Sequence, residues 1–96
     1  MTVEELLRSK RDEILRIAAK RGARNVRVFG SAARGEADGA SDIDLLVDLE
    51  PGRSLLDHTE LILDLQELLG HKVDVLTENS IYWLLRRRIL REARPL

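Results

Sequence analysis

The stretch from Asp42 to Leu49 limits the possible folds more than any other part of the chain. Apolar side chains occupy every second position, at Ile43, Leu45, Val47 and Leu49. The positions between them are mostly acidic, at Asp42, Asp44 and Asp48, with Leu46 as the exception. Successive side chains of a strand point to opposite faces of a sheet, so this pattern predicts a strand with one face in a core and an acidic other face.

Three longer helices are predicted by apolar residues spaced three and four apart, together with capping signals at their ends. The predicted helices span residues 3–21, 55–69 and 81–93. Thr2, Ser54 and Ser80 are the expected N-cap residues, and Gly22 and Gly70 are the expected stops. Each helix needs a sheet face or another helix against which to bury its apolar side.

Two further strands are predicted at 25–29 and 72–76, and Gly30–Gly35 has the small residues of a tight turn into a short helix. The order is helix, strand, short helix, strand, helix, strand, helix, which predicts an α+β (α/β-like) fold with helices packed on a small mixed sheet. The strands joined through a helix should be parallel, whereas the short connection between the first two also allows an antiparallel pair. Leu46 and Leu76 share the acidic face and need cover from a terminal helix or a bound protein.

Size and composition exclude several classes of protein. A chain of 96 residues is too short for two stable cores, so we expect one domain over residues 1–96. The net charge of −1 gives no overall field toward nucleic acid or an anionic membrane, and we expect neither as a direct partner. The absence of cysteine excludes disulfides and thiolate metal sites. No segment resembles a signal peptide or has the roughly 20 apolar residues that span a bilayer, so a cytoplasmic location is expected.

Three acidic residues are predicted to gather on the acidic face of the sheet. Asp42 and Asp44 lie two apart on one strand, so their side chains leave the same face. Asp74 lies between Val73 and Val75 on the next strand and is expected on that face too. Crowded carboxylates repel one another unless a cation neutralises them, and oxygen ligands favour Mg²⁺. Two such ions about 3.5 to 4 Å apart can hold the attacking and leaving oxygens of a phosphoryl displacement.

Gly30 and Ser31 can supply the hydrogen-bond donors that phosphates need. The missing side chain of Gly30 lets backbone amides approach an anion, and the Ser31 hydroxyl adds another donor. Arg34 can contact a phosphate or the acceptor, although a solvent-facing arginine explains it equally well. A Gly-Ser pair alone is usually only a turn, and an Asp-x-Asp pair is more often solvated than metal-bound. Their combination, with ten residues between the two motifs, is much more specific than either one.

The two motifs together resemble the signature of the polymerase-β-type nucleotidyltransferase superfamily. They are Val28–Gly35, which reads VFGSAARG, and Ser41–Val47, which reads SDIDLLV. Within that superfamily the short length, the strand Val73–Leu76 and the ending Ile89–Ala93 are similar to the minimal nucleotidyltransferases (MNT) that are paired with HEPN toxins. The resemblance covers nearly the whole chain and implies the nucleotidyltransferase fold.

The resemblance implies an antitoxin enzyme that transfers AMP from ATP to a tyrosine hydroxyl of a HEPN-family ribonuclease toxin. Gly30 and Ser31 would hold the triphosphate, Asp42 and Asp44 would bind a pair of Mg²⁺ ions, and Asp74 would help to deprotonate the acceptor while contacting one metal. Two alternatives stay open. One is a nucleotidyltransferase with a small-molecule acceptor, and the other is a non-catalytic antitoxin that neutralises the toxin by forming a complex.

The last predicted helix is the candidate surface for a partner. Tyr82 and Trp83 are adjacent, and adjacent residues of a helix cannot both face one narrow core stripe. One of them is therefore a candidate anchor for a partner protein. The helix is also locally basic, with arginines at Arg86, Arg87, Arg88, Arg91 and Arg94. These arginines either steer an acidic partner or form a solvated face that offsets the helix dipole.

Overall fold

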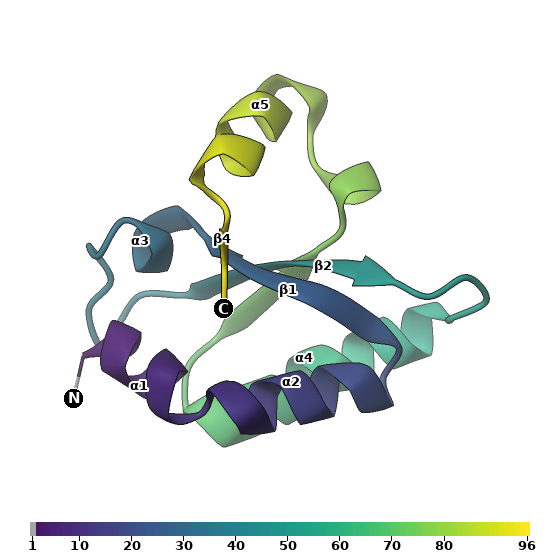
Figure 1. Cartoon of the computed structure of the whole chain (residues 1–96), viewed down its shortest axis with the longest axis horizontal. Coiled ribbons are helices and arrows are strands. Elements are labelled where there is room, and N and C mark those ends of the chain that lie inside the picture. Colours follow the sequence, from purple (N-terminus) through teal and green to yellow (C-terminus); the bar gives the residue numbers. More distant parts are fainter. Residues whose placement is uncertain (1) are drawn as a thin grey trace.

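A four-stranded sheet with helices on both faces forms the centre of the computed structural model, which describes residues 2–96. The strands are β1 (Ala23–Phe29), β2 (Ile43–Leu49), β3 (Val73–Leu76) and β4 (Arg94–Pro95), in the spatial order β3-β2-β1-β4. The helices are α1 (Val3–Ser9), α2 (Arg11–Lys20), α3 (Gly30–Ala33), α4 (Leu55–Leu69) and α5 (Trp83–Glu92), with a 3₁₀ turn η1 (Glu78–Ser80). Helices α1, α2 and α4 lie below the sheet in Figure 1, and α5 with η1 lies above it.

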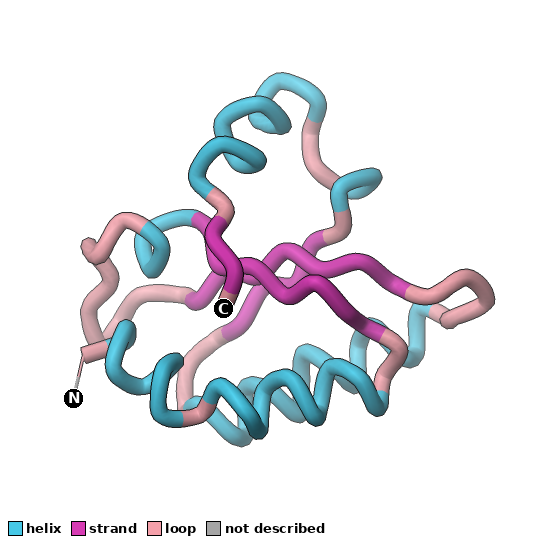
Figure 2. Tube along the Cα trace, viewed as in Figure 1, coloured by secondary structure: helices cyan, strands magenta, loops and turns pink. Residues whose placement is uncertain are grey.

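The strand directions confirm the mixed sheet. β2 pairs with β3 in parallel, as expected for strands joined through a helix, and β1 pairs with β2 antiparallel. Figure 2 shows the three longer strands side by side, with β4 crossing beside β1. The end of β1 lies beside the start of β2, because these two strands are antiparallel. The start of β3 lies at the same end of the sheet, because β2 and β3 are parallel.

The main core fills the space between the sheet and the lower helices. Ile43, Leu45 and Val47 of β2 are almost completely buried there, as their alternation predicts. Ile14 of α2 and Leu61 of α4 are also fully buried and pack into the same cluster. Burying one such aliphatic side chain contributes about 1.5 to 3 kcal/mol, so these positions dominate the stability of the sheet.

A second, smaller core lies on the opposite face, beneath α5. Leu46 is fully buried there beside Phe29 and Ile81, and the cluster is completed by Leu76 and Ile89 with other residues of α5. The expectation that a terminal helix covers Leu46 and Leu76 is therefore confirmed. On the same sheet face, Asp44 and Asp74 are only partly buried.

Three local predictions are wrong. The expected first helix is interrupted at Lys10, whose backbone leaves the helical conformation with φ of −102° and ψ of 7°. Ser80 is not the N-cap of α5. Its hydroxyl bonds to Thr77 instead and closes the short turn η1. Ile81 is extended and buried in the second core, so α5 begins only at Trp83. The short strand β4 is not predicted at all.

Within residues 2–96, none of the helices has both the length and the apolar character needed to cross a membrane.

Candidate functional site

One row of residues across three strands carries the proposed site. Phe29 of β1 lies opposite Asp44 of β2, and Asp44 lies opposite Asp74 of β3. Directly paired residues of neighbouring strands project from the same face of a sheet. Asp44 and Asp74 are therefore neighbours on the face that α5 partly covers, as the sequence predicts. Both are partly buried, because the side chains around them restrict access from solvent.

Asp42 lies at the edge of this site, just before β2. Its Oδ2 atom is 4.0 Å from the Nζ atom of Lys72, and the Ile43 amide donates to the Lys72 carbonyl at 2.9 Å. In the described part of the chain no three His, Asp or Glu side chains stand close enough together to hold a metal ion. The expected three-carboxylate cluster is thus found only in part: Asp44 and Asp74 are adjacent, whereas Asp42 pairs with a lysine that the sequence analysis does not consider.

The charges of the other two carboxylates nevertheless act on Asp44. Burial, followed by the negative charges of Asp74 and Asp42, raises the pKa of Asp44 to about 6. The positive charge of Arg34 acts in the opposite direction. A group that is costly to ionise beside two further acids fits a site that binds a cation, since a positive ion would relieve the repulsion.

This shift predicts how the stability of the metal-free protein depends on pH. The ordinary pKa of an aspartate is near 3.8, so between pH 3.8 and about 6 the folded chain binds more protons at Asp44 than the unfolded chain. Stability should therefore fall as the pH rises through this window. With EDTA present, we expect a higher melting temperature at pH 5 than at pH 7, measured by calorimetry. Asp44→Asn should show a smaller difference; an equal difference in the two proteins would contradict the assignment to Asp44.

Gly30 follows β1 directly and touches the Asp44 carboxylate. Its φ of +72° lies in the left-handed region, which glycine adopts without steric cost. A Cβ atom at this position would collide with Oδ2 of Asp44. The glycine thus provides both the turn and the space for the carboxylate. Ser31, the next residue, is half-buried, and its hydroxyl has no hydrogen-bond partner among residues 2–96, so it is available to a ligand.

Arg34 at the end of α3 is held by two glutamates. Its Nη1 atom donates to the Glu92 carboxylate at 3.1 and 3.2 Å, and its Nε atom donates to Glu36 at 3.2 Å. Burial opposes ionisation of Glu92, but hydrogen bonds from Arg88 and Arg34 keep its pKa below the ordinary value. Neither reading of Arg34 from the sequence includes this pairing. Glu92 is therefore a neighbour of the site that sequence analysis misses, although its position four residues after Arg88 signals one of its two partners.

Comparison with known proteins decides the family. The family model described as nucleotidyltransferase domain matches residues 11–96. The chain belongs to this family. A protein of Methanocaldococcus jannaschii, provisionally named a protein adenylyltransferase, is 47% identical over 97% of this chain and 96% of its own. The protein adenylyltransferase MntA of Thermococcus cleftensis is 39% identical over 94% of this chain and 88% of its own. The expectation of a nucleotidyltransferase enzyme is thereby confirmed.

Solved structures confirm the nucleotidyltransferase fold. One that is provisionally described as a minimal nucleotidyltransferase has a TM-score of 0.88 and 52% identity, and the match covers 100% of this chain and 97% of the other. A chain from the complex of a tri-AMPylated Shewanella oneidensis HEPN toxin with an MNT antitoxin has a TM-score of 0.66 and 20% identity. That match covers 97% of this chain and 71% of the other. At this identity the second likeness shows the fold alone.

Proposed function

We propose that this nucleotidyltransferase is an antitoxin that uses Mg²⁺ to transfer AMP from ATP to a tyrosine hydroxyl of a partner HEPN-family ribonuclease toxin. The observation that carries the proposal is the direct pairing of Asp44 with Asp74 beside the Gly30 turn. Relatives that span almost the whole chain are named protein adenylyltransferases, which supports AMP as the transferred group and a protein as the acceptor. A chain of the same fold comes from a complex with an AMPylated HEPN toxin, which supports a HEPN toxin as the partner.

The paired carboxylates would divide the chemical work. Asp42 and Asp44 would hold Mg²⁺, and Asp74 would contact one of the ions. When bound, a pair of Mg²⁺ ions neutralises charge on the phosphates and polarises the attacking and leaving oxygens. Asp42 needs a rotation away from Lys72 to serve as a ligand. The Asp44 carboxylate has room in its position because Gly30 carries no Cβ atom.

The reaction itself is an in-line displacement at the α-phosphorus of ATP. The tyrosine oxygen forms a bond to this phosphorus, the bond to the oxygen that bridges to the β-phosphate breaks, and pyrophosphate leaves. Asp74 accepts the proton of the tyrosine hydroxyl. The amides that follow Gly30 and the free Ser31 hydroxyl hold the triphosphate, and Arg34 contacts a phosphate once it exchanges part of its pairing with Glu92 and Glu36 for the ligand.

Labelled ATP tests the proposal. The chain is incubated with Mg²⁺ and the purified product of the neighbouring gene, in parallel with ATP labelled at the α- or the γ-phosphate. We expect label on the partner from α-labelled ATP only, no label in EDTA, and none when the acceptor tyrosine of the partner is replaced by phenylalanine. Label from γ-labelled ATP would instead establish phosphate transfer and contradict the proposal.

A non-catalytic antitoxin is the second candidate, and one observation favours it. Four consecutive large side chains at the start of α5, Tyr82 to Leu85, are exposed, which is typical of a protein-binding surface. The same experiment separates the two functions. A partner that is tightly bound and inhibited but carries no label under any condition would establish inhibition by complex formation alone.

A further inference from the structure

The start of α5 carries the most concentrated apolar surface of the described chain. Tyr82, Trp83, Leu84 and Leu85 are exposed by 59%, 74%, 62% and 45%. The rings of Tyr82 and Trp83 pack on each other at 5.9 Å between centroids, tilted by 55°. We call these four residues, together with Arg87 and Arg91 on the same helix, the α5 ridge. In Figure 1 the helix α5, which carries the ridge, lies above the sheet, on the opposite side from α1, α2 and α4.

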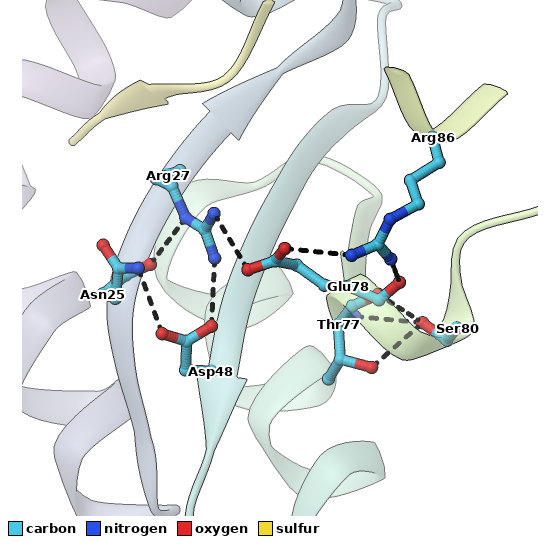
Figure 3. Close-up of polar contacts among 7 residues, drawn as sticks. All are labelled: Asn25, Arg27, Asp48, Thr77, Glu78, Ser80 and Arg86. Carbon is cyan, nitrogen blue, oxygen red and sulfur yellow. Dashed lines mark hydrogen bonds and ion pairs between the residues drawn. The ribbon is translucent and has the colours of Figure 1, made fainter. Parts of the chain in front are cut away.

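A polar network fixes the segment that leads into the ridge. Arg27 of β1 has only 14% of its side chain exposed and pairs with Asp48 at 3.1 Å and with Glu78 at 3.6 Å. Glu78 also pairs with Arg86 of α5 at 3.3 Å. Figure 3 shows these side chains linking two strands, η1 and α5, with Asn25 donating to Asp48. The exposed apolar residues therefore lie on a segment that is already held in place. Binding of a partner would cost little conformational entropy in this segment.

The other end of α5 is tied to the site. Glu92 pairs with Arg34 at 3.1 Å, and Arg34 lies at the end of the turn that begins with Gly30 and Ser31. Glu92 is only 20% exposed and also pairs with Arg88. A protein seated on the ridge would thus lie against a helix whose far end contacts the proposed nucleotide site. This position suits a surface that holds an acceptor protein.

The charge of the ridge specifies its partner. Arg87 and Arg91 are exposed, and neither forms an ion pair with another residue in 2–96. The one acidic residue of α5, Glu92, is already neutralised by two arginines. The chain as a whole has a net charge of −1, so this basic surface is local. The apolar side chains of the α5 ridge, with unpaired arginines beside them, complement a partner surface that has an apolar recess and an acidic rim.

We propose that the α5 ridge is the docking surface for the acceptor protein, and that this protein presents an apolar recess for Trp83 with acidic residues around it. The inference rests on the proposed function, because it assigns a binding surface to the acceptor of that reaction. Trp83 is the expected energetic centre, since tryptophan and arginine dominate the binding energy of most protein interfaces. Arg87 and Arg91 guide the encounter and fix the orientation.

A second copy of the chain fits the ridge less well. The other exposed leucines, Leu55, Leu56 and Leu63, lie on α4 on the far side of the sheet. Most acidic residues of α4 are already paired, because Glu60 and Asp64 pair with Arg21 and Asp57 pairs with Arg53, which leaves Glu67 as the one acidic side chain of α4 without an ion pair in residues 2–96. A contact from α5 of one copy to α4 of another would also be head-to-tail and would not close into a dimer.

Binding measurements test the docking surface separately from the chemistry. The affinity for the purified product of the neighbouring gene is measured by calorimetry without nucleotide, at low and at physiological salt. We expect Trp83→Ala to weaken binding about 30-fold or more. The double variant Arg87→Glu/Arg91→Glu should weaken binding and reduce its dependence on salt. The controls Leu56→Ala and Arg16→Glu change an exposed leucine and an exposed arginine of the opposite helices, and should bind as the wild type does.

Each outcome decides one claim. Wild-type affinity in both ridge variants would overturn the docking surface, whether or not the partner becomes labelled. If the ridge variants lose binding and the wild-type chain binds the partner without labelling it, the docking surface stands and the proposed reaction is excluded. Sedimentation of the chain alone gives a further check: self-association that disappears in Trp83→Ala would assign the ridge to a second copy and overturn the inference.

Discussion

Asp44→Asn is expected to lower the rate of AMP transfer about a thousandfold or more, which corresponds to about 4 kcal/mol of transition-state stabilisation. The substitution keeps the size of the side chain and removes its negative charge. Asp44 is the residue that joins the two halves of the site, since it faces Asp74 across the strands and touches Gly30. Single-turnover labelling of the partner with α-labelled ATP measures the loss.

The same substitution should stabilise the fold. Ionised Asp44 is crowded by Asp74 and Asp42, and the neutral amide removes this repulsion. Solvent reaches the site, so the gain is limited to about 1 kcal/mol, or about 4 °C in melting temperature. Asp64→Asn on α4, on the opposite side of the sheet, is the control. It loses a pair with Arg21 and should lower stability slightly while leaving the transfer rate close to that of the wild type. Loss of transfer in this control as well would contradict a specific role for Asp44.

Gly30→Ala is expected to lower transfer at least about a hundredfold, because the new methyl group displaces the Asp44 carboxylate from its position. The backbone adds a second cost. A φ of +72° is unfavourable by roughly 1 to 2 kcal/mol for a residue with a Cβ atom, so the variant should also unfold at lower temperature. Labelling and thermal unfolding measure the two effects separately.

Gly70→Ala isolates the contribution of the collision. Gly70 has a φ of +68°, close to that of Gly30, but a Cβ atom there would meet open space. The control should therefore lose similar stability and keep its transfer rate. If both variants lose the same fraction of activity, backbone strain rather than contact with Asp44 explains the effect, and the tight fit between Gly30 and Asp44 has no catalytic importance.

Local patterns account for most of the fold. The alternation over 42–49 predicts β2, and the structure has it at Ile43–Leu49. The cap at Ser54 is confirmed in full, since its hydroxyl accepts from the Asp57 amide while the Asp57 carboxylate accepts from the Ser54 amide. Gly70 ends α4 in the left-handed conformation, as expected of a stop. These features depend on residues only a few positions apart, which sequence patterns describe well.

Features that depend on distant contacts escape the sequence. β4 is two residues long and exists because Arg94 and Pro95 pair with Val28 and Arg27. The expected start of the last helix fails because Ile81 is drawn into the second core. For the site, strand parity places Asp74 correctly. By contrast, Arg34 and Glu92 are 58 residues apart, and only the docking of α5 brings them together.

The alignment of β2 with β3 links correct folding to the proposed chemistry. A slip of one residue would exchange the two faces of β2, so that Ile43 would stand beside Asp74 and Asp44 would turn toward the lower helices. An unpaired carboxylate in an aliphatic interior is costly, and the apolar side chain of Ile43 would lose its place in the core. Misaligned chains are therefore strongly disfavoured. The same carboxylates that crowd the acidic face thus also select the correct register of the sheet.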